Sequence, residues 1–367
     1  MSARGLRVGV TGIHLGENAQ PGPGVIRSLR EALGDEVVII GLAYDALDSS
    51  LYVPGLLDDA FLLPYPSAGP RAYFDRLVAI QDACGLDVLV PNLDVELPVL
   101  LRLERPLHER GIRMALPSAA ALARRTKERL PELARAVSVA TPQTLVVADE
   151  RTLAMAGEAL AYPMLVKGPF YEADVVHGPA EAAASFRRLA GRWGLPLLAQ
   201  RHVHGEELDV IALGDGAGRV HGPVAMRKTV VTKLGKAWGA VTIEDASLIE
   251  AATRIVSALA WRGGCEIEMM RESGTGTLYL IEVNPRFPAW VYLATAAGVN
   301  LPVGTICLAL DRELPSYDPY RPGVSYVRHA SEAIGDPADI EALLTEGRTR
   351  RRAPVPERTV DPSPVAR

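Results

Sequence analysis

The sequence predicts a protein of mixed α/β and α+β class, built from two or three packed units. The chain has 367 residues, which is more than one hydrophobic core usually holds. Strands, loops and helices alternate through its first third, which is typical of a parallel sheet covered by helices. Further along, residues 265–284 alternate polar and apolar side chains on either side of a Gly-containing turn, which predicts a β-hairpin.

The composition excludes several classes of protein. Hydrophobic residues make up 48% of the chain and the net charge is −5, so nothing predicts binding to nucleic acid or to an anionic membrane. No apolar run reaches the roughly 18 residues that span a bilayer, and the start of the chain enters a strand without a signal-peptide pattern. Cys84, Cys265 and Cys307 lack metal-ligand spacing and lie in apolar surroundings. We therefore expect free thiols and a cytoplasmic location.

The first third of the chain is expected to form a parallel sheet with helices on its faces. The predicted strands are Leu6–Val10, Val37–Leu42, Asp87–Val90 and residues 110–117, and the predicted helices are Val25–Leu33 and a segment ending near Arg110. Ligand-binding loops lie at the carboxyl ends of the strands in sheets of this kind.

The first of these loops argues against a dinucleotide site. Its sequence, TGIHLGENAQPGPG, lacks the GxGxxG spacing that lets a pyrophosphate approach the backbone. A nicotinamide-dependent dehydrogenase, with Asp45 on the ribose, is therefore disfavoured. Glu17, Asn18, Asp94 and Glu96 are candidates for substrate contacts, although polar loop residues that bond to nearby backbone groups would look the same.

The predicted hairpin has an unusual polar face. Glu266 and Glu268 alternate with apolar residues on the first strand, and we expect Leu280, Glu282 and Asn284 to share one face of the second. Opposed carboxylates destabilise a sheet, and a buried unpaired carboxylate costs several kcal/mol, so a cation is expected between Glu268 and Glu282. Mg2+ suits this role because it binds one or two carboxylates together with water and phosphate oxygens. The alternative is a hairpin whose polar side faces water.

The segment LIEVNPRF, Leu280 to Phe287, resembles the metal-binding signature of the ATP-grasp superfamily, in particular its carbamoyl-phosphate-synthetase-like and amino-acid-ligase branches. The resemblance implies that Glu268, Glu282 and Asn284 hold the metal of Mg-ATP, with Mn2+ as an alternative, and that Arg286 orients the reacting oxygens.

The resemblance also implies a domain organisation. We expect a Rossmann-like N-terminal domain over residues 1–118, followed by a two-lobed ATP-grasp domain. Its small lobe would span residues 119–195 and its large lobe residues 196–344. The remaining residues, 345–367, are rich in Arg, Pro and Asp and are expected to form a disordered tail.

Two lysines match the phosphate-binding positions of the family. Lys127 lies in RRTKERL, within a segment at 118–136 that is expected to be helical, although the family's usual Asp-Lys pair is Thr-Lys here. Lys167 ends the apolar strand YPMLVK, where a lysine is costly to bury unless an anion meets it. The alternative for each lysine is a solvated side chain. The segment after Lys167 departs from the family's Gly-rich lid, so no phosphate contact can be assigned to the lid at Phe170–Val176.

The run PLLAQRHVHGEELDVIAL resembles the family's nucleoside-binding hinge. Gln200 and Glu207 have the spacing of the residues that bind adenine and ribose, and the resemblance implies main-chain contacts from Arg201 and Val203 to the base.

A basic cluster follows the hinge. Its members, Arg227, Lys228, Lys233 and Lys236, are interleaved with Val and Thr, which indicates strand and loop. Beside a triphosphate such a cluster would neutralise charge during phosphoryl transfer. We expect Arg227 and Lys228 to join Arg286 as catalytic residues; a solvated surface patch is the alternative.

The resemblance implies an ATP-dependent ligase that joins a small-molecule or peptide carboxylate to an amine or other nucleophile. An acyl phosphate would activate the carboxylate, and ADP and phosphate would be released, in peptide or natural-product tailoring. Two alternatives stay open: a kinase or carboxylase-like relative, and a nucleotide-binding regulatory protein without turnover. The resemblance is also compatible with a homodimer.

Overall fold

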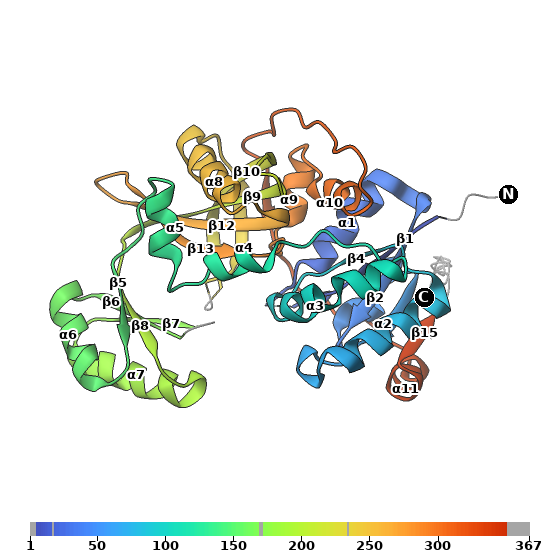
Figure 1. Cartoon of the computed structure of the whole chain (residues 1–367), viewed down its shortest axis with the longest axis horizontal. Coiled ribbons are helices and arrows are strands. Elements are labelled where there is room, and N and C mark those ends of the chain that lie inside the picture. Colours follow the sequence, from blue (N-terminus) through green and yellow to red (C-terminus); the bar gives the residue numbers. More distant parts are fainter. Residues whose placement is uncertain (1–4, 17, 169–171, 233–234, 351–367) are drawn as a thin grey trace, which may run out of the picture.

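The computed structural model describes residues 5–16, 18–168, 172–232 and 235–350 (Figure 1). Within these residues the strands form three sheets, each in a separate region of the molecule (Figure 1). The predicted class of α/β and α+β is confirmed. In the described part of the chain, no helix is long and apolar enough to cross a membrane.

The N-terminal sheet has the strand order β15-β3-β2-β1-β4. Its four parallel strands are β1 (Leu6–Val10), β2 (Val37–Ala43), β3 (Asp59–Leu62) and β4 (Val88–Val90). One face packs against α1 (Gly22–Leu33), and the other packs against α2 (Pro70–Cys84) and α3 (Leu97–Glu109). The parallel layer is therefore as predicted, except that residues 110–117 contribute an isolated bridge from Arg113 to Val88 in place of a strand.

The four-stranded sheet lies apart from the rest of the molecule, at the lower left of Figure 1. Its antiparallel strands follow the order β5-β8-β6-β7, and their bounds are β5 (Thr144–Val147), β6 (Met164–Lys167), β7 (Ala173–Val176) and β8 (Leu197–Arg201). The helices α6 (Glu150–Leu160) and α7 (Pro179–Trp193) complete its core. The predicted boundary after residue 195 would put β8 in the large lobe, whereas its hydrogen bonds to β5 and β6 put it in this sheet.

The largest sheet carries the predicted hairpin. Its strand order is β13-β12-β9-β10-β11-β14, and the bounds are β9 (Gly205–Asp215), β10 (Val220–Val231), β11 (Ala237–Thr242), β12 (Arg262–Glu272), β13 (Leu278–Asn284) and β14 (Ser325–Val327). One face packs against α8 (Ala246–Ala258) and α5 (Leu130–Ala136). The other face shares a core with α9 (Val291–Ala296), α10 (Leu301–Ala309) and the N-terminal sheet. This second face carries the polar groups described below.

The segment around Lys127 is not one helix, as predicted, but two short ones. Ser118 caps α4 (Ala119–Arg124) by accepting a hydrogen bond from the backbone N–H of Ala121. Lys127 lies in the turn between α4 and α5. The chain bends there, and the turn directs Lys127 toward the hairpin.

A β-bulge corrects one prediction for the hairpin. The register shifts between Glu268 and Met269, so that Met269 pairs with Leu280 while Glu268 pairs with Glu282. An extra residue reverses the faces beyond it. Leu280 consequently packs in the core with Val283, and not on the polar face with Glu282 and Asn284.

The C-terminal region corrects another prediction, because residues 345–350 are ordered. The helix α11 (Pro337–Glu346) leads into β15 (Arg348–Arg350), which pairs antiparallel with β3. The guanidinium of Arg348 lies 2.7 Å from the Asp59 carboxylate, and Arg76 donates to the carbonyl of Gly347. The rest of the predicted tail, 351–367, lies outside the described residues.

Candidate active site

The hairpin brings three carboxylates to one face of the large sheet. Glu266 pairs with Asn284, and Glu268 pairs with Glu282, in the antiparallel register of β12 and β13. The predicted opposition of Glu268 and Glu282 is confirmed. Side chains two residues apart on a strand share a face, so Glu266 joins them.

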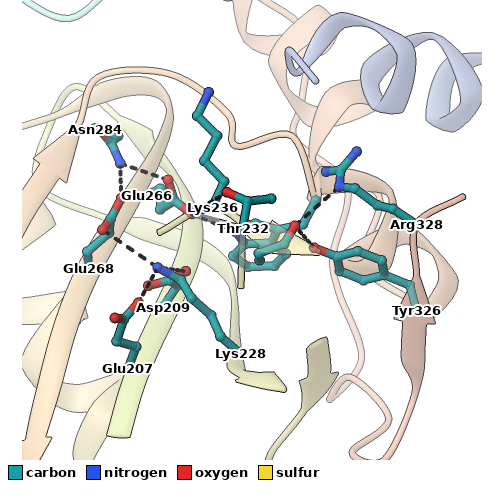
Figure 2. Close-up of polar contacts among 12 residues, drawn as sticks. Glu207, Asp209, Lys228, Thr232, Lys236, Glu266, Glu268, Asn284, Tyr326 and Arg328 are labelled. Atoms are coloured by element: carbon teal, nitrogen blue, oxygen red, sulfur yellow. Dashed lines mark hydrogen bonds and ion pairs between the residues drawn. The ribbon is translucent and has the colours of Figure 1, made fainter. Parts of the chain in front are cut away.

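The amide of Asn284 links two of these carboxylates. Its Nδ2 donates to Oε2 of Glu266 over 2.8 Å and to Oε1 of Glu268 over 2.7 Å (Figure 2). Both amide hydrogens are therefore used, and Oδ1 is the atom left for a ligand.

The buried ammonium group of Lys228 lies among the acidic residues and offsets their negative charge. Nζ of Lys228 lies 3.0 Å from Glu207, 3.5 Å from Asp209 and 3.8 Å from Glu268 (Figure 2). Burial alone would lower the pKa of Lys228, but Asp209 and the neighbouring glutamates raise that pKa well above its usual range. Burial raises the pKa of Asp209, and Lys228 opposes that change. Lys228 therefore stays charged at the centre of the site.

Arg227, in contrast, does not join the site. It lies next to Lys228 on β10, and successive side chains of a strand point to opposite faces. Its guanidinium forms a half-exposed pair with Glu206, 3.5 Å away. The prediction that Arg227 is catalytic is not supported by this placement. Lys233 lies outside the described residues.

The two predicted phosphate lysines face the hairpin. Nζ of Lys127 lies 3.7 Å from Oε1 of Glu282. Lys167, at the end of β6, donates to Oε1 of Gln200 over 2.6 Å. Burial, followed by repulsion from Lys127, lowers the pKa of Lys167 to about 8, and Glu282 and Glu268 oppose this change. Lys167 therefore shares one electrostatic environment with Lys127 and both carboxylates.

The hinge residues lie where β8 leaves the four-stranded sheet for β9. Gln200 is buried and donates to Oγ1 of Thr144 over 2.8 Å, so its side chain bridges Thr144 and Lys167. Val203 is buried as well. The backbone N–H of Arg201 donates to the carbonyl of Gln143. Its side chain pairs with Glu272 at 2.9 Å and lies over the ring of Tyr279.

Glu207, the predicted ribose ligand, is held by the 3.0 Å contact with Lys228. Phe170 and Tyr171 of the predicted lid lie outside the described residues. The part of the lid that is described, residues 172–176, leads into edge strand β7. Glu172 there pairs with Arg188 and Arg192 on α7.

Arg286 contacts the N-terminal unit. Its Nε lies 2.9 Å from Oδ1 of Asp94, which follows β4, and Asp94 also pairs with Arg125 at 3.4 Å. Arg125 donates in turn to the carbonyl of Val283 on the hairpin. Asp94 therefore connects the carboxyl edge of the parallel sheet to the residues beside the acidic cluster.

Two further cations border the same acidic face. Arg328 donates to the carbonyls of Ala237 and Ala289, over 3.2 and 2.8 Å. Burial lowers the pKa of Lys236, and Arg286 and Arg328 lower it further, while Glu266 and Glu268 raise it. Lys236 therefore lies close enough to Arg286 and Arg328 for their positive charges to disfavour its protonated form.

The donor set fits a hard divalent cation. No group of three or more His, Cys, Asp or Glu side chains in the described chain is arranged to hold a metal by itself. The predicted set supplies two carboxylates and one amide oxygen, which suits Mg2+ because that ion takes its other ligands from water and phosphates. Burial raises the pKa of Glu282, and the Glu268 carboxylate adds to this effect. A cation between Glu268 and Glu282 would relieve that repulsion.

Several residues that complete the site are not among those predicted from the sequence. Glu266 and Asp209 could have been predicted, because each lies two residues along the same strand from a predicted site residue. These residues are Glu268 and Glu207, respectively. Arg125 and Arg328 could not, since they come from segments far from the hairpin in the chain. Trp290 lies close after the hairpin in the sequence, but no pattern there predicts its hydrogen bond to Glu266.

Comparisons with known proteins identify relatives. Residues 195–332 match the family described as ATP-grasp in the biosynthetic pathway with Ter operon. A D-alanine–D-alanine ligase from Chromohalobacter salexigens is 29% identical over 171 residues, which cover 43% of this chain and 54% of the ligase. The chain therefore spans about half the length of the curated relative that it matches.

Solved structures share the fold over most of the chain. The biotin carboxylase domain of Hydrogenobacter thermophilus 2-oxoglutarate carboxylase, with MgADP, ADP and bicarbonate, has a TM-score of 0.66 and 16% identity, covering 87% of this chain and 73% of that one. An L-amino acid ligase from Bacillus licheniformis has a TM-score of 0.64 and 17% identity, covering 85% and 76%. Residues 195–332 are therefore similar to an ATP-grasp family, and the chain shares the fold of these solved structures.

Proposed function

We propose that this chain is an ATP-dependent ligase that joins a carboxylate to an amine through an acyl phosphate, releasing ADP and phosphate. One observation carries the proposal: two lysines lie beside the carboxylates of the hairpin. Nζ of Lys127 lies 3.7 Å from Oε1 of Glu282. Lys167 interacts electrostatically with Glu282 and Glu268. Opposed lysines and acidic residues are the partners that a metal–triphosphate complex needs. The names of the D-alanine–D-alanine ligase and the L-amino acid ligase support the choice of reaction.

The nucleotide would bind between the four-stranded sheet and the hairpin. Lys127 and Lys167 would hold its phosphates. Gln200 and Glu207 would bind the nucleoside, and the backbone at Arg201 and Val203 would face the base. On binding, the hydrogen bond between Lys167 and Gln200 would be replaced by contacts with ATP. Glu207 would likewise give up part of its contact with Lys228 to bind ATP.

Glu268, Glu282 and the Oδ1 of Asn284 would hold Mg2+, with Mn2+ as an alternative. When bound, such a metal neutralises phosphate charge and polarises the phosphorus–oxygen bonds. Lys228 positions Glu268, because its ammonium lies 3.8 Å from that carboxylate.

The reaction would proceed in two displacements. A substrate carboxylate oxygen attacks the γ-phosphorus, and the bond to ADP breaks. The amine lone pair then attacks the acyl carbon, the bond to phosphate breaks, and the amine loses a proton. Arg286, with Lys236 and Arg328 beside it, would orient the carboxylate and stabilise charge on the acyl phosphate. In this proposal Arg286 keeps its expected role, Lys228 positions Glu268 and does not contact the phosphates, and Arg227 has no role.

Measurement of ADP and phosphate release tests the proposal. Purified full-length protein is incubated with Mg-ATP and panels of amino acids and other carboxylates, with and without amines. ADP that forms only when a carboxylate and an amine are both present supports ligation. ADP formation with a phosphorylated product and no need for amine indicates a kinase, and nucleotide binding without ADP indicates a regulatory protein.

A carboxylase-like reaction is the second candidate. It is favoured by the likeness to a biotin carboxylase domain solved with MgADP and bicarbonate. In that reaction bicarbonate would be the carboxylate that is phosphorylated. Bicarbonate-dependent ADP release without any other carboxylate would select it over ligation.

We also propose the organisation and setting of the protein. The N-terminal unit would comprise residues 1–118, the small lobe would run from 119 to the end of β8, and the large lobe would continue to 344. We propose a cytoplasmic location, which the free cysteines support. The family description, a biosynthetic pathway with Ter operon, supports peptide or natural-product tailoring.

A homodimer is compatible with the fold, and sedimentation of the full chain would test it.

A further inference from the structure

Glu266 is a buried carboxylate that the proposed reaction does not use directly. Its side chain lies on the acidic face of β12, and the residue is 5% exposed. Its Oε1 accepts from Nε1 of Trp290 over 2.6 Å, and its Oε2 accepts from Nδ2 of Asn284 over 2.8 Å. Each oxygen thus has one donor, so the carboxylate bridges Trp290 and Asn284.

This bridge determines which end of the Asn284 amide faces the acidic residues. The opposite orientation would place Oδ1 of Asn284 against the oxygens of Glu266 and Glu268, with repulsion in place of two hydrogen bonds. The nitrogen therefore faces inward, and Oδ1 is left for a cation. An amide nitrogen has no lone pair available for Mg2+, whereas an amide oxygen is a good ligand.

We propose that Glu266 is a positioning residue of the metal site, which fixes the amide of Asn284 with its oxygen toward the divalent cation. The inference rests on the proposed function, because it takes Asn284 as a metal ligand. Groups that orient a ligand in this way typically contribute about 10–100-fold to metal affinity.

Trp290 fixes Glu266 from the other side. Its ring is buried in the core that the large sheet shares with β1 and α1. The indole N–H can donate only, so it requires an acceptor at this position. The orientation of Asn284 is thus set by a chain of contacts that begins in the junction between the N-terminal unit and the large sheet.

Substitution of Glu266 by Gln changes the donor pattern while it keeps the size. Gln has one acceptor and one NH2 group, so it cannot accept from Trp290 and Asn284 at once. If it accepts from Trp290, its NH2 group favours a reversed Asn284 amide, which turns the nitrogen toward the cation. In E266Q/N284D, the carboxylate introduced at position 284 accepts from the amide introduced at position 266. That carboxylate still offers an oxygen to the metal, and the total charge is unchanged.

The test is Mn2+ binding to the full chain, followed by the loss of the free Mn2+ electron paramagnetic resonance signal, with and without ADP. We expect E266Q to weaken Mn2+ binding about tenfold. Glu266→Asp, whose shorter side chain cannot reach both donors, should also weaken it, and provides a second variant if E266Q does not fold. E266Q/N284D should recover part of the affinity, whereas Asn284→Asp in the wild-type background, where the new carboxylate faces Glu266 and Glu268, should not raise it. A merely structural role of Glu266 would not explain that difference. Glu250→Gln, on the exposed face of α8, is the matched control.

The outcomes separate this inference from the function on which it rests. If the wild-type chain takes up no Mn2+ even with ADP, the proposed metal site and this inference are both overturned. If the wild type binds Mn2+, Asn284→Ala weakens binding and folded E266Q binds like the wild type, only the role of Glu266 is overturned. A double variant that binds no better than E266Q would also overturn it.

Discussion

The carboxylate of Asp94 lies 2.9 Å from Nε of Arg286, across the junction between the N-terminal unit and the hairpin. Both side chains are about one-fifth exposed, so solvent screens the pair only partly. Asp94 lies just beyond the carboxyl end of β4, where ligand loops gather in parallel sheets. The contact fixes a proposed catalytic arginine from a different unit of the molecule.

Asp94→Asn should reduce turnover more than nucleotide binding. The variant keeps the shape of the side chain but loses the charge that holds Arg286 and Arg125. We expect kcat for ADP release to fall about tenfold, because a misplaced Arg286 would no longer orient the substrate carboxylate for attack. Nucleotide affinity should stay within about twofold, since Asp94 contacts none of the proposed nucleotide ligands. Asp45→Asn, an exposed residue on the same edge of the sheet, is the control; equal losses in both variants would contradict the prediction.

Lys228→Met should destabilise the fold strongly, whereas Arg227→Met should not. Removal of the Lys228 ammonium leaves Glu207, Asp209 and Glu268 without their shared cation, which typically costs about 3–5 kcal/mol. Arg227 forms only a half-exposed pair, so its loss should cost less than about 1 kcal/mol. Urea unfolding, followed by circular dichroism at pH 8 in the presence of a chelator, measures both.

The loss in Lys228→Met should shrink as the pH falls. Without Lys228, the buried carboxylates have a pKa above that of the unfolded chain, so the folded state binds more protons and gains stability toward lower pH. Unfolding of the variant at pH 5.5 should therefore resemble the wild type more closely than at pH 8. A loss that is independent of pH would argue that packing, and not charge, is responsible.

Nucleotide binding should weaken as the pH rises through about 8. Burial, followed by repulsion from Lys127, lowers the pKa of Lys167 to about 8 in the free chain. A phosphate beside Lys167 favours its charged form, so binding takes up a proton above that pH, and affinity falls by at most about tenfold per pH unit. Calorimetric titration with a non-hydrolysable ATP analogue from pH 6.5 to 9.5 measures the slope. Lys167→Arg, which stays charged, should flatten it; the same slope in both proteins would refute the assignment.

Glu282→Ala should abolish the dependence of nucleotide binding on Mg2+ and leave the fold intact. Glu282 faces the site on β13, and its nearest cation is Lys127 at 3.7 Å. Its loss removes one of two carboxylate ligands and also removes a repulsion with Glu268. Thermal unfolding with and without Mg-ADP measures both effects. Preserved Mg-ADP stabilisation in Glu282→Ala, equal to that in Glu250→Ala, would remove the metal assignment.

Much of the candidate site could be predicted from the sequence because its central residues lie on one hairpin. Alternation on β12 and β13 brings Glu268 opposite Glu282, and the local pattern carries that information. The same period of two could have separated Lys228 from Arg227. It could not have shown which of the two is buried, because that depends on the packing of the far face of the sheet.

The remaining features arise from long-range packing or local irregularity. The bulge that moves Leu280 into the core has no Gly or Pro to signal it. Asp94 and Arg328 join the hairpin from distant segments, and nothing in their neighbouring residues predicts these contacts. Trp290 lies near the hairpin in the sequence, yet its hydrogen bond to Glu266 depends on how the chain turns after β13. The pairing of β15 with β3 was hidden by the Arg- and Pro-rich composition around it.

That pairing has a consequence for biosynthesis. β3 leaves the ribosome long before the strand that covers its open edge, which contains residues 348–350. The backbone groups along that edge of β3 therefore stay unpaired until residues 348–350 have been translated. An uncovered edge of this kind can recruit strands from other molecules. Truncation before Arg348 should thus yield a nascent protein that depends more strongly on chaperones.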